Sequence, residues 1–355
     1  MSTYKKSGVN ISMGDRCSSL AYGAAKKTFA SRKGLIGKPV ISNGGFSGAL
    51  DFGKFYLIQN CDGVGSKIAV AEAMKKYDTL GFDLLAMVAD DAICVGAETI
   101  SITNTIDTNK VSAEAIGPMM EGLLKACIQQ KVVIPGGEIA EMPDLMKGNS
   151  WNAAAVGIVE KSKMITGKNV RPGDKIIALR SRGLRSNGFS LVRYILKKNF
   201  GAKWYTKKFD ARKSWGDAVL TPSIIYSAAL LEIIGRYGKK RKIAVKALAH
   251  VTGGGIPGNI TRVLGGFGAE LDNLFPPHKM MLELQALGKV TDSEAYKTWN
   301  MGVGMLIISN ESAKIEKSMA ALGIKAQVVG HVTKEKGVRL ISRGKFQSGK
   351  DLLFS

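Results

Sequence analysis

Residues 55–106 read FYLIQNCDGVGSKIAVAEAMKKYDTLGFDLLAMVADDAICVGAETISITNTI, and the order of patterns within this stretch decides the predicted fold. It begins as an apolar strand and passes into a polar, glycine-containing turn that ends at Lys67. Alanine, leucine and methionine then recur at helical spacing over 67–76 and 80–94. The segment 99–106 is rich in β-branched residues and alternates as a strand does. Strands that alternate with helices predict an α/β domain whose strand ends carry polar loops.

The same alternation continues beyond this stretch and divides the chain into two segments. The turn Pro172-Gly173-Asp174 opens a second series of elements, so we predict two α/β domains, 1–170 and 171–355. A length of 355 residues agrees with roughly two domains. The further predicted elements are a helix at 112–130, a buried strand at 131–138 that ends in glycines, strands at 151–160 and 175–180, a helix that starts after Ser186 or Asn187, a helix at 221–237 with Pro222 in its first turn, a strand, glycine turn and helix across 246–264, and strands within 299–310 and 326–332.

The composition is that of a globular cytoplasmic protein. Hydrophobic residues make up 45% and charged residues 23%, which excludes a disordered chain. The four cysteines show no C-x-x-C spacing and there are three histidines, so a zinc site or a disulfide scaffold is not expected. The first ten residues contain no apolar signal region, and no apolar run approaches the ~20 residues that span a bilayer. We therefore expect no membrane partner.

The chain is strongly basic, with 51 Lys and Arg against 29 Asp and Glu and a net charge of +22. This excess favours phosphate-bearing partners, either nucleic acid or small anionic metabolites. The basic residues are scattered, and the run Lys239-Lys240-Arg241-Lys242 follows a helical pattern, as a solvated surface loop does. The charge permits nucleic-acid binding without indicating it, and we expect no specific nucleic-acid partner.

The densest polar cluster is Asp62-Gly63-Val64-Gly65-Ser66-Lys67, directly after the first strand. Glycines let backbone N–H groups approach a phosphate, Asp binds the accompanying Mg²⁺, and Lys meets phosphate oxygens. The spacing is not that of a P-loop. A tight turn with a surface lysine explains the same residues equally well.

Asp90-Asp91 ends an apolar helical run, with Asp83 and Glu98 nearby. Two charges ~4 Å apart repel by about 1 kcal/mol in water and about 4 at a half-buried site. Neighbouring carboxylates in so apolar a run therefore indicate a bound cation or a paired base. The alternative is that one Asp caps the helix and the other faces solvent.

Three further turns carry candidate residues. In Gly136–Pro143, Glu138 and Glu141 are spaced to lie on one side of a helical turn. Asn43–Gly48 is a glycine-rich loop that could cradle phosphates, and a plain surface loop is the alternative. His250 precedes the triple glycine 253–255, where a helix N-terminus would offer amides to an anion. A lone histidine is more often a packed structural residue, and His278 and His331 have no comparable context.

These motifs, taken in order, resemble those of the phosphoribosylformylglycinamidine cyclo-ligase family, the aminoimidazole ribonucleotide synthetases of purine biosynthesis. The likeness covers nearly the whole chain. Its most specific elements are the Tyr-Lys opening with Gly8-Val9, GGE-x-AEMP and AH-x-TGGG. The matching segments are Tyr4–Val9, GGFSGAL, DGVGSK, DLLAM, GAE, GGEIAEMP, RPGD, SNGFSLVR, AHVTGGG and NMGVGM.

The resemblance implies an α/β (α+β) fold of two domains, and a homodimer whose N-terminal sheets join into a barrel. It implies that formylglycinamidine ribonucleotide and ATP give aminoimidazole ribonucleotide, ADP and phosphate through a phosphorylated amide, the iminophosphate. Mg²⁺ would be held by Asp62, Asp90 and Asp91, and His250 would orient or protonate near the reacting amide, with Lys67 and Asp62 as further catalytic residues. The expected ATP contacts are Gly44, Gly45, Phe46, Ser47, Gly63, Gly65, Ser66, Lys67 and Glu138. The expected contacts to the substrate phosphate are Ser186, Asn187, Thr252, Gly253, Gly254 and Gly255.

Several positions depart from the pattern usual in the resembled family. Asp90 and Asn104 exchange the usual Asn and Asp, which conserves the number of carboxylates and suggests a rearranged cation site. The other departures are Ser66 for Thr, Tyr22 for Lys, Arg185 for His and Ile224 for Arg. We interpret them as a divergent branch of the same enzyme.

Two other functions are consistent with the sequence. A relative within the superfamily could phosphorylate a different amide, carbamoyl or phosphate acceptor. A basic nucleic-acid-binding protein could also have kept this scaffold, although mere folding does not need Asp62, Lys67, Asp91 and Glu138 together.

Overall fold

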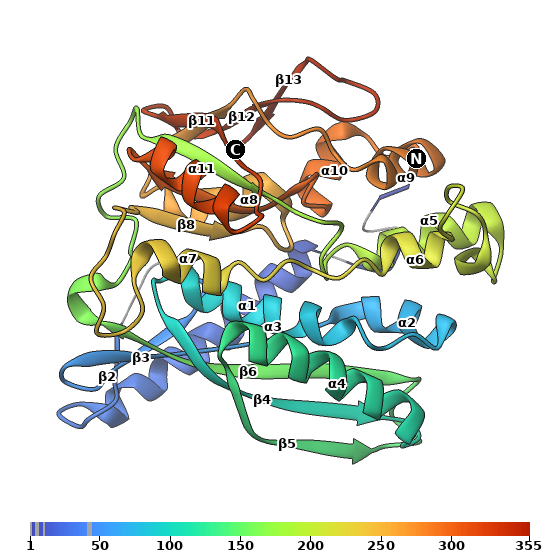
Figure 1. Ribbon diagram of the computed structural model, residues 1–355, viewed down its shortest axis with the longest axis horizontal. Coiled ribbons are helices and arrows are strands. Elements are labelled where there is room, and N and C mark those ends of the chain that lie inside the picture. Colours follow the sequence, from blue (N-terminus) through green and yellow to red (C-terminus); the bar gives the residue numbers. More distant parts are fainter. Residues whose placement is uncertain (1, 4–6, 10, 41–44) are drawn as a thin grey trace.

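The computed structural model describes residues 2–3, 7–9, 11–40 and 45–355, and these form two β-sheets with helices between them (Figure 1). The N-terminal sheet has the strand order β1-β2-β3-β6-β4-β5. Only β4 and β5 run parallel, and every other neighbouring pair is antiparallel. Its strands are β1 (Lys38–Val40), β2 (Gly48–Asp51), β3 (Phe55–Gly63), β4 (Glu98–Thr108), β5 (Val133–Glu141) and β6 (Asn149–Glu160).

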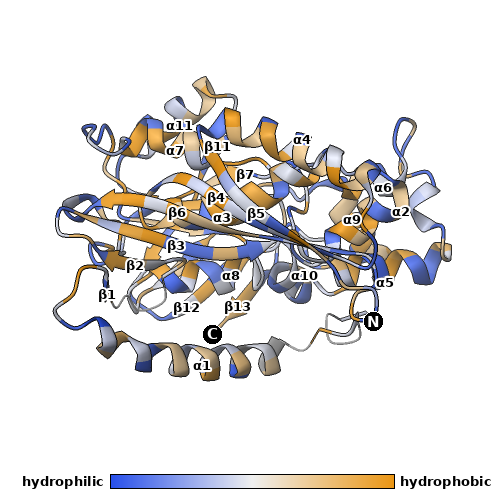
Figure 2. Ribbon diagram, turned by 90° about the horizontal axis from the view of Figure 1, so that it is seen from below, coloured by the Kyte–Doolittle hydropathy of each residue, from blue (hydrophilic) through white to orange (hydrophobic). Residues whose placement is uncertain are grey.

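The helices of this half cover one face of the sheet. The covering helices are α2 (Ile68–Met74), α3 (Leu80–Cys94) and α4 (Ala113–Gln130), while α1 (Ile11–Lys27) lies outside both sheets (Figure 2). On the other face, Gln59, Cys61, Thr103 and Ala154 follow one another across β3, β6 and β4 and are exposed. Neither sheet closes into a barrel within the described residues, so the barrel expected across a homodimer lies beyond this single chain.

The C-terminal half contains the second sheet, in the order β13-β12-β9-β11-β7-β10-β8. Here only β12 and β9 run parallel. The strands are β7 (Lys175–Arg180), β8 (Ala247–His250), β9 (Gly268–Leu271), β10 (Val303–Ser309), β11 (Ala326–Thr333), β12 (Gly337–Ile341) and β13 (Asp351–Phe354). The helices are α5 (Phe189–Phe200), α6 (Trp215–Val219), α7 (Ser227–Ile234), α8 (Gly255–Ile260), α9 (Lys279–Gly288), α10 (Asp292–Thr298) and α11 (Ser312–Ala321). Short 3₁₀ turns lie at Thr28–Arg32 (η2), Gly65–Lys67 (η3), Lys161–Lys163 (η4), Trp204–Thr206 (η5) and Thr261–Val263 (η6).

Helix α3 lies between the two halves. Thirteen of its 15 residues are buried, because it contacts β3, β4 and β6 on one side and α7 and β8 on the other. A helix that is apolar all round is expected only where protein surrounds it. Figure 1 shows α3 in the middle of the molecule, below α7 and above β6. The mixed α/β class with two domains is therefore observed, and α3 is the element that both domains share.

The predicted helix at 221–237 is six residues too long at its start. The structure begins α7 at Ser227, and residues 221–226 form no regular element. The backbone N–H of Ser223 donates to Asp83, and that of Tyr226 donates to Asp90. Carboxylates of α3 thus bind the backbone groups that a longer helix would have used, which the local apolar pattern does not show.

The strand predicted at 131–138 is present, but it is neither buried nor ended by its glycines. β5 runs through Gly136 and Gly137 to Glu141 as the edge strand, and most of it is exposed. Glu138 and Glu141 therefore lie on a strand and not on a helical turn. An apolar run reads as a buried strand whether the chain itself or a partner covers it.

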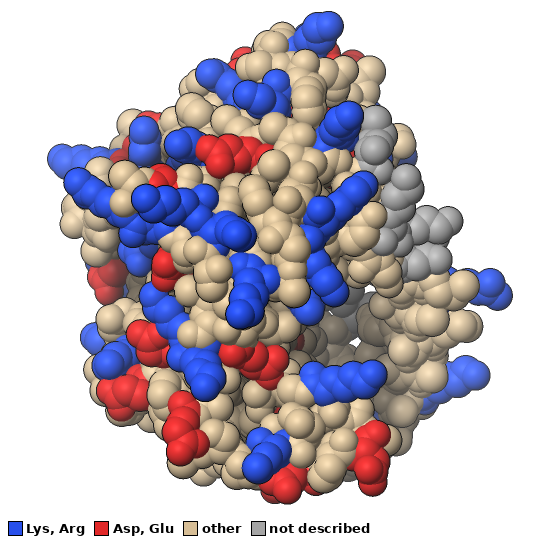
Figure 3. Space-filling model, turned by 90° about the vertical axis from the view of Figure 1, so that its right-hand side faces the viewer, with Lys and Arg blue, Asp and Glu red and all other residues tan. Residues whose placement is uncertain are grey.

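Basic residues are dispersed over the surface, as their distribution in the sequence predicts. Figure 3 shows Lys and Arg on one face of the molecule, with Asp and Glu between many of them.

None of the helices within the described residues is long and apolar enough to cross a membrane.

Candidate functional site

Asp62 lies near the end of β3, on the face of the N-terminal sheet that the helices cover. It pairs with Ala153 of β6, which pairs in turn with Asn104 of β4. Burial raises the pKa of Asp62 to about 6, the N–H of Gly63 opposes this shift, and the charge of Asp91 adds to it. Gly63 has no room for a side chain, since a Cβ there would lie 2.2 Å from Oδ1 of Asn152.

Asp91 comes from α3 and is the second carboxylate at this position. Burial raises its pKa to about 7, although the nearby charges of Arg262 and Arg185 lower it. The charge of Asp91 also raises the pKa of Asp62, so the carboxylate of α3 lies close enough to act on the carboxyl of β3. Neighbouring acids with raised pKa values are typical of sites that bind a cation or share a proton.

Asp90 is bonded differently from this pair, and its predicted role as a metal ligand stays a prediction that would require its present contacts to open. Its Oδ1 accepts the N–H groups of Tyr226 at 2.8 Å and Ser227 at 3.0 Å. Its Oδ2 accepts from Nη2 of Arg185 at 2.8 Å, and neither side chain reaches solvent. Both oxygens are therefore used inside the protein, and Asp90 joins α3 to the C-terminal domain.

His250 ends β8 and connects Arg185 to Asp91. Its Nε2 lies 2.7 Å from Nη2 of Arg185, and its Nδ1 lies 2.8 Å from Oδ1 of Asp91. Burial lowers the pKa of His250 to about 3, and the charge of Arg185 adds to this effect. The ring is thus neutral at physiological pH with both nitrogens occupied, so its predicted role in orienting or protonating the amide stays a prediction that requires this network to open.

Lys67 is fully buried and does not face a phosphate site in this structure. Its ammonium lies 2.7 Å from Oδ2 of Asp83 and donates to the carbonyl of Thr221 at 2.9 Å. Burial lowers its pKa, and the charge of Asp83 opposes that change. Lys67 would have to leave this ion pair to reach a triphosphate, and no local motif predicts the pair because Asp83 lies on the next long helix and Thr221 lies 154 residues away.

Three glycine-containing turns from separate segments approach one another in this region: 63–66, 186–188 and 253–255. A Cβ on Gly65 would lie 3.5 Å from the carbonyl of Ser186, and a Cβ on Gly253 would lie 3.8 Å from Nδ2 of Asn187. Ser66 contacts Ser190, with 3.3 Å between the hydroxyl oxygens. Buried Oγ of Ser186 and Oδ1 of Asn187 have no hydrogen-bond partner in the described part of the chain. Unpaired buried polar atoms at such a position fit groups that a ligand would satisfy.

The triple glycine is shaped by a residue that the motif analysis did not select. Gly254 and Gly255 have φ values of +87° and +62°, and a Cβ on Gly255 would lie 1.9 Å from the carbonyl of Tyr296. The buried amide of Asn259 donates to the carbonyls of Gly253 at 3.0 Å and Gly255 at 2.8 Å. Thr252 contacts Asn259 at 3.4 Å. Asn259 lies only four residues beyond the glycines, so a search for a side chain able to fix their carbonyls could have found it.

The glycine-rich loop is held by the C-terminal domain. Arg262 donates to the carbonyl of Gly45 at 2.9 Å, and its guanidinium lies 3.8 Å from the centre of the Phe46 ring. Ser47 accepts from Asn60 of β3 at 2.9 Å, which places this loop beside the strand that ends in Asp62. Gly44 lies outside the described residues. No local pattern singled out Arg262, because its role depends on a contact across more than 200 residues.

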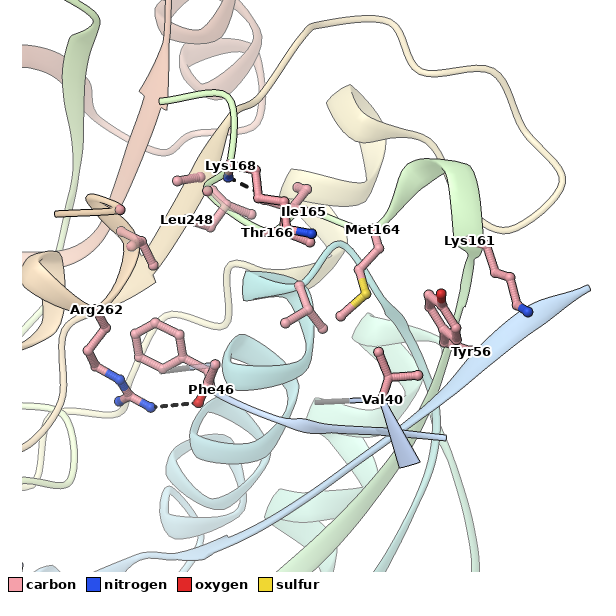
Figure 4. Close-up of a pocket in the computed structure, with 16 residues that line it drawn as sticks. Val40, Phe46, Tyr56, Lys161, Met164, Ile165, Thr166, Lys168, Leu248 and Arg262 are labelled. Carbon is pink, nitrogen blue, oxygen red and sulfur yellow. Dashed lines mark hydrogen bonds between the residues drawn. The ribbon is translucent and has the colours of Figure 1, made fainter. Parts of the chain in front are cut away.

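Two cavities border this loop. One of about 640 Å³ lies between the domains, with Phe46, Tyr56, Met164, Leu248 and Arg262 among its lining residues (Figure 4). The other, of about 620 Å³, is lined by Tyr22, Phe29, Ser47, Asn60 and Cys61 among others. Gly45 and Phe46 border both cavities, so the loop separates one from the other.

Glu138 and Asn104 do not join the acid pair. Glu138 is exposed on the edge strand β5, and strands β6 and β4 separate that strand from β3. Oδ1 of Asn104 accepts from Nε1 of Trp151 at 2.9 Å, so its amide is used within the sheet. The exchange at positions 90 and 104 therefore leaves Asp62 and Asp91 as the two remaining candidate carboxylates, with the charge of Asp91 acting on Asp62.

These two acids fit Mg²⁺ only together with a substrate. The described residues contain no group of three or more His, Cys, Asp or Glu side chains placed to hold a metal ion. Mg²⁺ is commonly bound by one or two carboxylates with substrate phosphates and water completing its octahedron. The donor set thus agrees with a nucleotide-borne cation and not with a metal site built by the protein alone.

Comparison with known proteins identifies relatives along almost the whole chain. Residues 46–159 match the family model "AIR synthase related protein, N-terminal domain", and residues 171–343 match its C-terminal counterpart. A phosphoribosylformylglycinamidine cyclo-ligase of Thermococcus gammatolerans is 37% identical, with 97% of this chain and 99% of that protein covered. The protein of the same name from Methanocaldococcus jannaschii is also 37% identical, over 94% of this chain and 92% of the relative.

Solved structures with far lower identity share the fold. The HypE–HypF complex superposes with a TM-score of 0.60 at 14% identity, over 88% of this chain and 93% of that one. A thiamine-monophosphate kinase from Stenotrophomonas maltophilia gives a TM-score of 0.59 at 15% identity, over 91% and 96%. AaThiL complexed with AMPPCP and TMP gives 0.57 at 12% identity, over 87% and 91%. At these identities the likeness establishes the two-domain architecture alone.

The buried position of Asp62 predicts a stability that depends on pH. Its folded pKa of about 6 exceeds the ordinary 3.8, so the folded state holds the proton more tightly and stability falls as pH rises from 3.8 to 6. The shift corresponds to about 3 kcal/mol at 1.36 kcal/mol per unit. Asp62→Asn removes this penalty, so its free energy of unfolding should exceed that of the wild type by about 1–3 kcal/mol at pH 8 and match it at pH 4. Urea denaturation at both pH values measures the difference.

Asp51→Asn is the control, because Lys161 lowers the pKa of this exposed carboxyl and the expected pH trend has the opposite sign. An Asp62→Asn protein that is less stable than the wild type at pH 8 would contradict the assignment of Asp62 as a strained, ligand-binding acid.

Proposed function

The chain belongs to the phosphoribosylformylglycinamidine cyclo-ligase family, and we propose that its paired acids and glycine turns perform the ATP-dependent ring closure of that family. It is a ligase of purine biosynthesis, since relatives of this name match it at 35–37% identity over nearly its full length. The substrate is formylglycinamidine ribonucleotide, and the products are aminoimidazole ribonucleotide, ADP and phosphate. The observation that supports the site assignment is that Asp91 lies near enough to Asp62 for its charge to raise the pKa of Asp62, in a region where separate glycine turns approach one another.

The chemistry requires that a poor leaving group be converted into a good one. The amide oxygen of the substrate attacks the γ-phosphorus of ATP, the bond from that phosphorus to the departing ADP oxygen breaks, and the amide nitrogen releases its proton to give the iminophosphate. The neighbouring amidine nitrogen then attacks the imidate carbon. The bond between that carbon and the phosphorylated oxygen breaks, and inorganic phosphate leaves. The protein contributes mainly position and charge compensation, as is general for phosphoryl transfer.

Each part of the site has a task in this scheme. Asp62 and Asp91 would hold the cation that accompanies ATP, and that cation would supply neutralisation of the phosphate charge. Ser186, Asn187 and the glycine turn 253–255 bind the substrate phosphate through amides and unpaired polar atoms. Ser47 and the amides of 45–47 lie over the ATP phosphates.

The adenosine part of ATP occupies the cavity lined by Tyr22 and Phe29. Ser47 and Asn60 line this cavity, Asn60 lies two residues before Asp62 on the same face of β3, and two aromatic rings can pack on a base. The cavity in Figure 4 leads instead to Tyr56, six residues or about 20 Å along β3 from Asp62. The cavity lined by Tyr22 and Phe29 therefore allows a triphosphate to reach the acids while the base of ATP lies between aromatic side chains.

Replacement of one tyrosine in each cavity tests this placement. Tyr22→Ala should raise the KM for ATP by about two- to tenfold, the loss of one aromatic contact, and leave kcat nearly unchanged. Tyr56→Ala is the matched control and should leave both constants close to wild type. Steady-state kinetics with varied ATP measures both variants, and a KM effect confined to Tyr56→Ala would place the base in the cavity of Figure 4.

The protein acts as a homodimer whose N-terminal sheets face each other. Cys61, Thr103 and Ala154 are exposed on the uncovered face, and Val133 and Ile139 on the edge strand are 63% and 46% exposed. Exposed apolar side chains on a sheet edge are a liability unless a partner covers them.

Sedimentation analysis should give twice the 38.0 kDa of one chain. Ala154→Lys places a charge at the centre of the uncovered face and should give monomers, whereas Ala320→Lys on α11 should remain dimeric. A wild-type protein that sediments as a monomer at micromolar concentration would remove the dimer proposal.

The overall function is tested by the product. Purified protein with formylglycinamidine ribonucleotide, Mg²⁺ and ATP should form aminoimidazole ribonucleotide and ADP in equal amounts. Asp62→Ala should lower turnover by about a hundredfold or more, the effect of removing a preorganised charge, and leave the fold intact. Asp351→Ala, which alters an exposed carboxylate on β13, should retain wild-type turnover.

Other outcomes distinguish the alternatives. ADP release stimulated by another amide, carbamoyl or phosphate acceptor, with no imidazole product, would identify a different kinase of this fold. Tight and steeply salt-dependent binding of DNA or RNA without any turnover would identify the scaffold as a nucleic-acid-binding protein. The cytoplasmic location that purine biosynthesis implies is examined by fractionation of cells.

A further inference from the structure

We propose that Arg185 is a positioning residue: it fixes His250 as the neutral tautomer with its proton on Nδ1, and thereby commits Oδ1 of Asp91 to the histidine. Arg185 precedes Ser186 in the turn between β7 and α5. Its charge also acts on Asp91, but the hydrogen bonds that connect it to Asp91 pass through His250. This inference rests on the proposed function only for the task of Asp91, and the tautomer itself is a property of the protein alone.

The arginine is held from several directions. Its Nη2 donates to Asp90, its Nη1 donates to the carbonyl of Ile224 at 2.9 Å, and its guanidinium lies 5.2 Å from the centre of the Tyr226 ring. The side chain is 1% exposed, and its backbone has a φ of +62°. A non-glycine residue keeps this left-handed conformation only where its surroundings impose it. The guanidinium therefore has a fixed position from which to address His250.

The identity of the donors determines the tautomer. A guanidinium has five N–H donors and no acceptor, so Nε2 of His250 must accept the bond that joins it to Arg185. A neutral imidazole with an accepting Nε2 carries its proton on Nδ1. That proton then points to Oδ1 of Asp91 at 2.8 Å. The hydrogen bonds follow one direction, from Arg185 through His250 to Asp91.

Asp90 makes this arrangement electrically neutral. It accepts from Arg185 and from two backbone amides, and these three donors favour its ionised form although burial opposes that form. The positive charge beside His250 is therefore balanced within hydrogen-bond distance. The histidine remains a neutral link, and its hydrogen bond engages Oδ1 of Asp91.

The same chain of contacts crosses between the domains. Asp90 and Asp91 belong to α3, whereas Arg185, Tyr226 and His250 belong to the C-terminal half. The orientation of Asp91 thus depends on how the C-terminal domain lies against α3. A purely structural ion pair between Arg185 and Asp90 would stabilise the domain contact without any effect on the histidine proton, and this difference can be measured.

Nitrogen NMR of histidine reads the tautomer directly. The chain has three histidines, so ¹⁵N-histidine labelling gives three ring systems, and His278→Gln and His331→Gln variants assign the signal of His250 by elimination. In the full-length wild-type protein we expect Nδ1 protonated and Nε2 unprotonated for His250. A wild-type His250 that carries its proton on Nε2 would overturn the proposal regardless of any activity.

The informative variant is Arg185→Met combined with Asp90→Asn. The single change Arg185→Met leaves a buried carboxylate unpaired and is expected to unfold readily, whereas the double change removes both charges together. In the folded double variant, His250 should lose the fixed tautomer and show exchange between the two forms. The affinity for Mg²⁺·ATP, measured by calorimetry, should fall by about tenfold or more, as is usual when a partner that orients a metal ligand is removed. Turnover should fall with it.

Arg180→Met is the matched control. Arg180 is also partly buried and donates to a backbone carbonyl, that of Pro276, but it does not touch His250. This variant should lower stability and leave the His250 tautomer and the Mg²⁺·ATP affinity unchanged. A double variant with the wild-type tautomer and affinity would show that Arg185 is structural only. If the wild type has the expected tautomer but forms no imidazole product, the positioning stands and the proposed function fails.

Discussion

Buried carboxylates of α3 attach the two domains to each other, and the geometry of the site depends on this attachment. Asp83 binds Lys67 and the backbone and hydroxyl of Ser223, and Asp90 binds Arg185 and two amides at the start of α7. A buried charge that loses its partner costs about 3–5 kcal/mol, so neither acid can shift without disrupting these contacts. The helix therefore determines where the C-terminal domain lies, and with it where His250 meets Asp91.

The spacing along α3 separates structural acids from the functional one. Positions 83 and 90 are seven residues apart, nearly two full helical turns, and so face the same side, toward the C-terminal domain. Position 91 is rotated by about 100° and faces the end of β3 that carries Asp62. Two adjacent aspartates thus have opposite tasks. Burial in the middle of the molecule raises the pKa of both carboxyl groups.

The elements that local patterns predict are mostly those observed, and the errors occur where distant residues decide. The strand of 55–63, the helix of 80–94 and the helix of 113–130 follow from their own periodicity. The irregular segment before α7 and the exposed strand β5 do not, because an acid of another element or an uncovered edge determines them. The same reason explains the site. Asp62 and the glycine turns were found as motifs, whereas Asp83 and Arg262 act through contacts that no short motif contains.

Three of the positions at which this chain departs from the resembled family are explained by their contacts with one another. Asp90, Arg185 and Ile224 stand where the resembled family usually has Asn, His and Arg, and all three meet: Arg185 donates to the Asp90 carboxylate and to the Ile224 carbonyl. A cationic side chain absent at 224 is matched by one present at 185, and the added positive charge beside His250 is balanced by the added carboxylate at 90. The exchange of Asp90 with Asn104 is therefore unrelated to the number of metal ligands, since Asn104 bonds Trp151 elsewhere in the sheet. These three departures are one coupled change in the contacts that support His250.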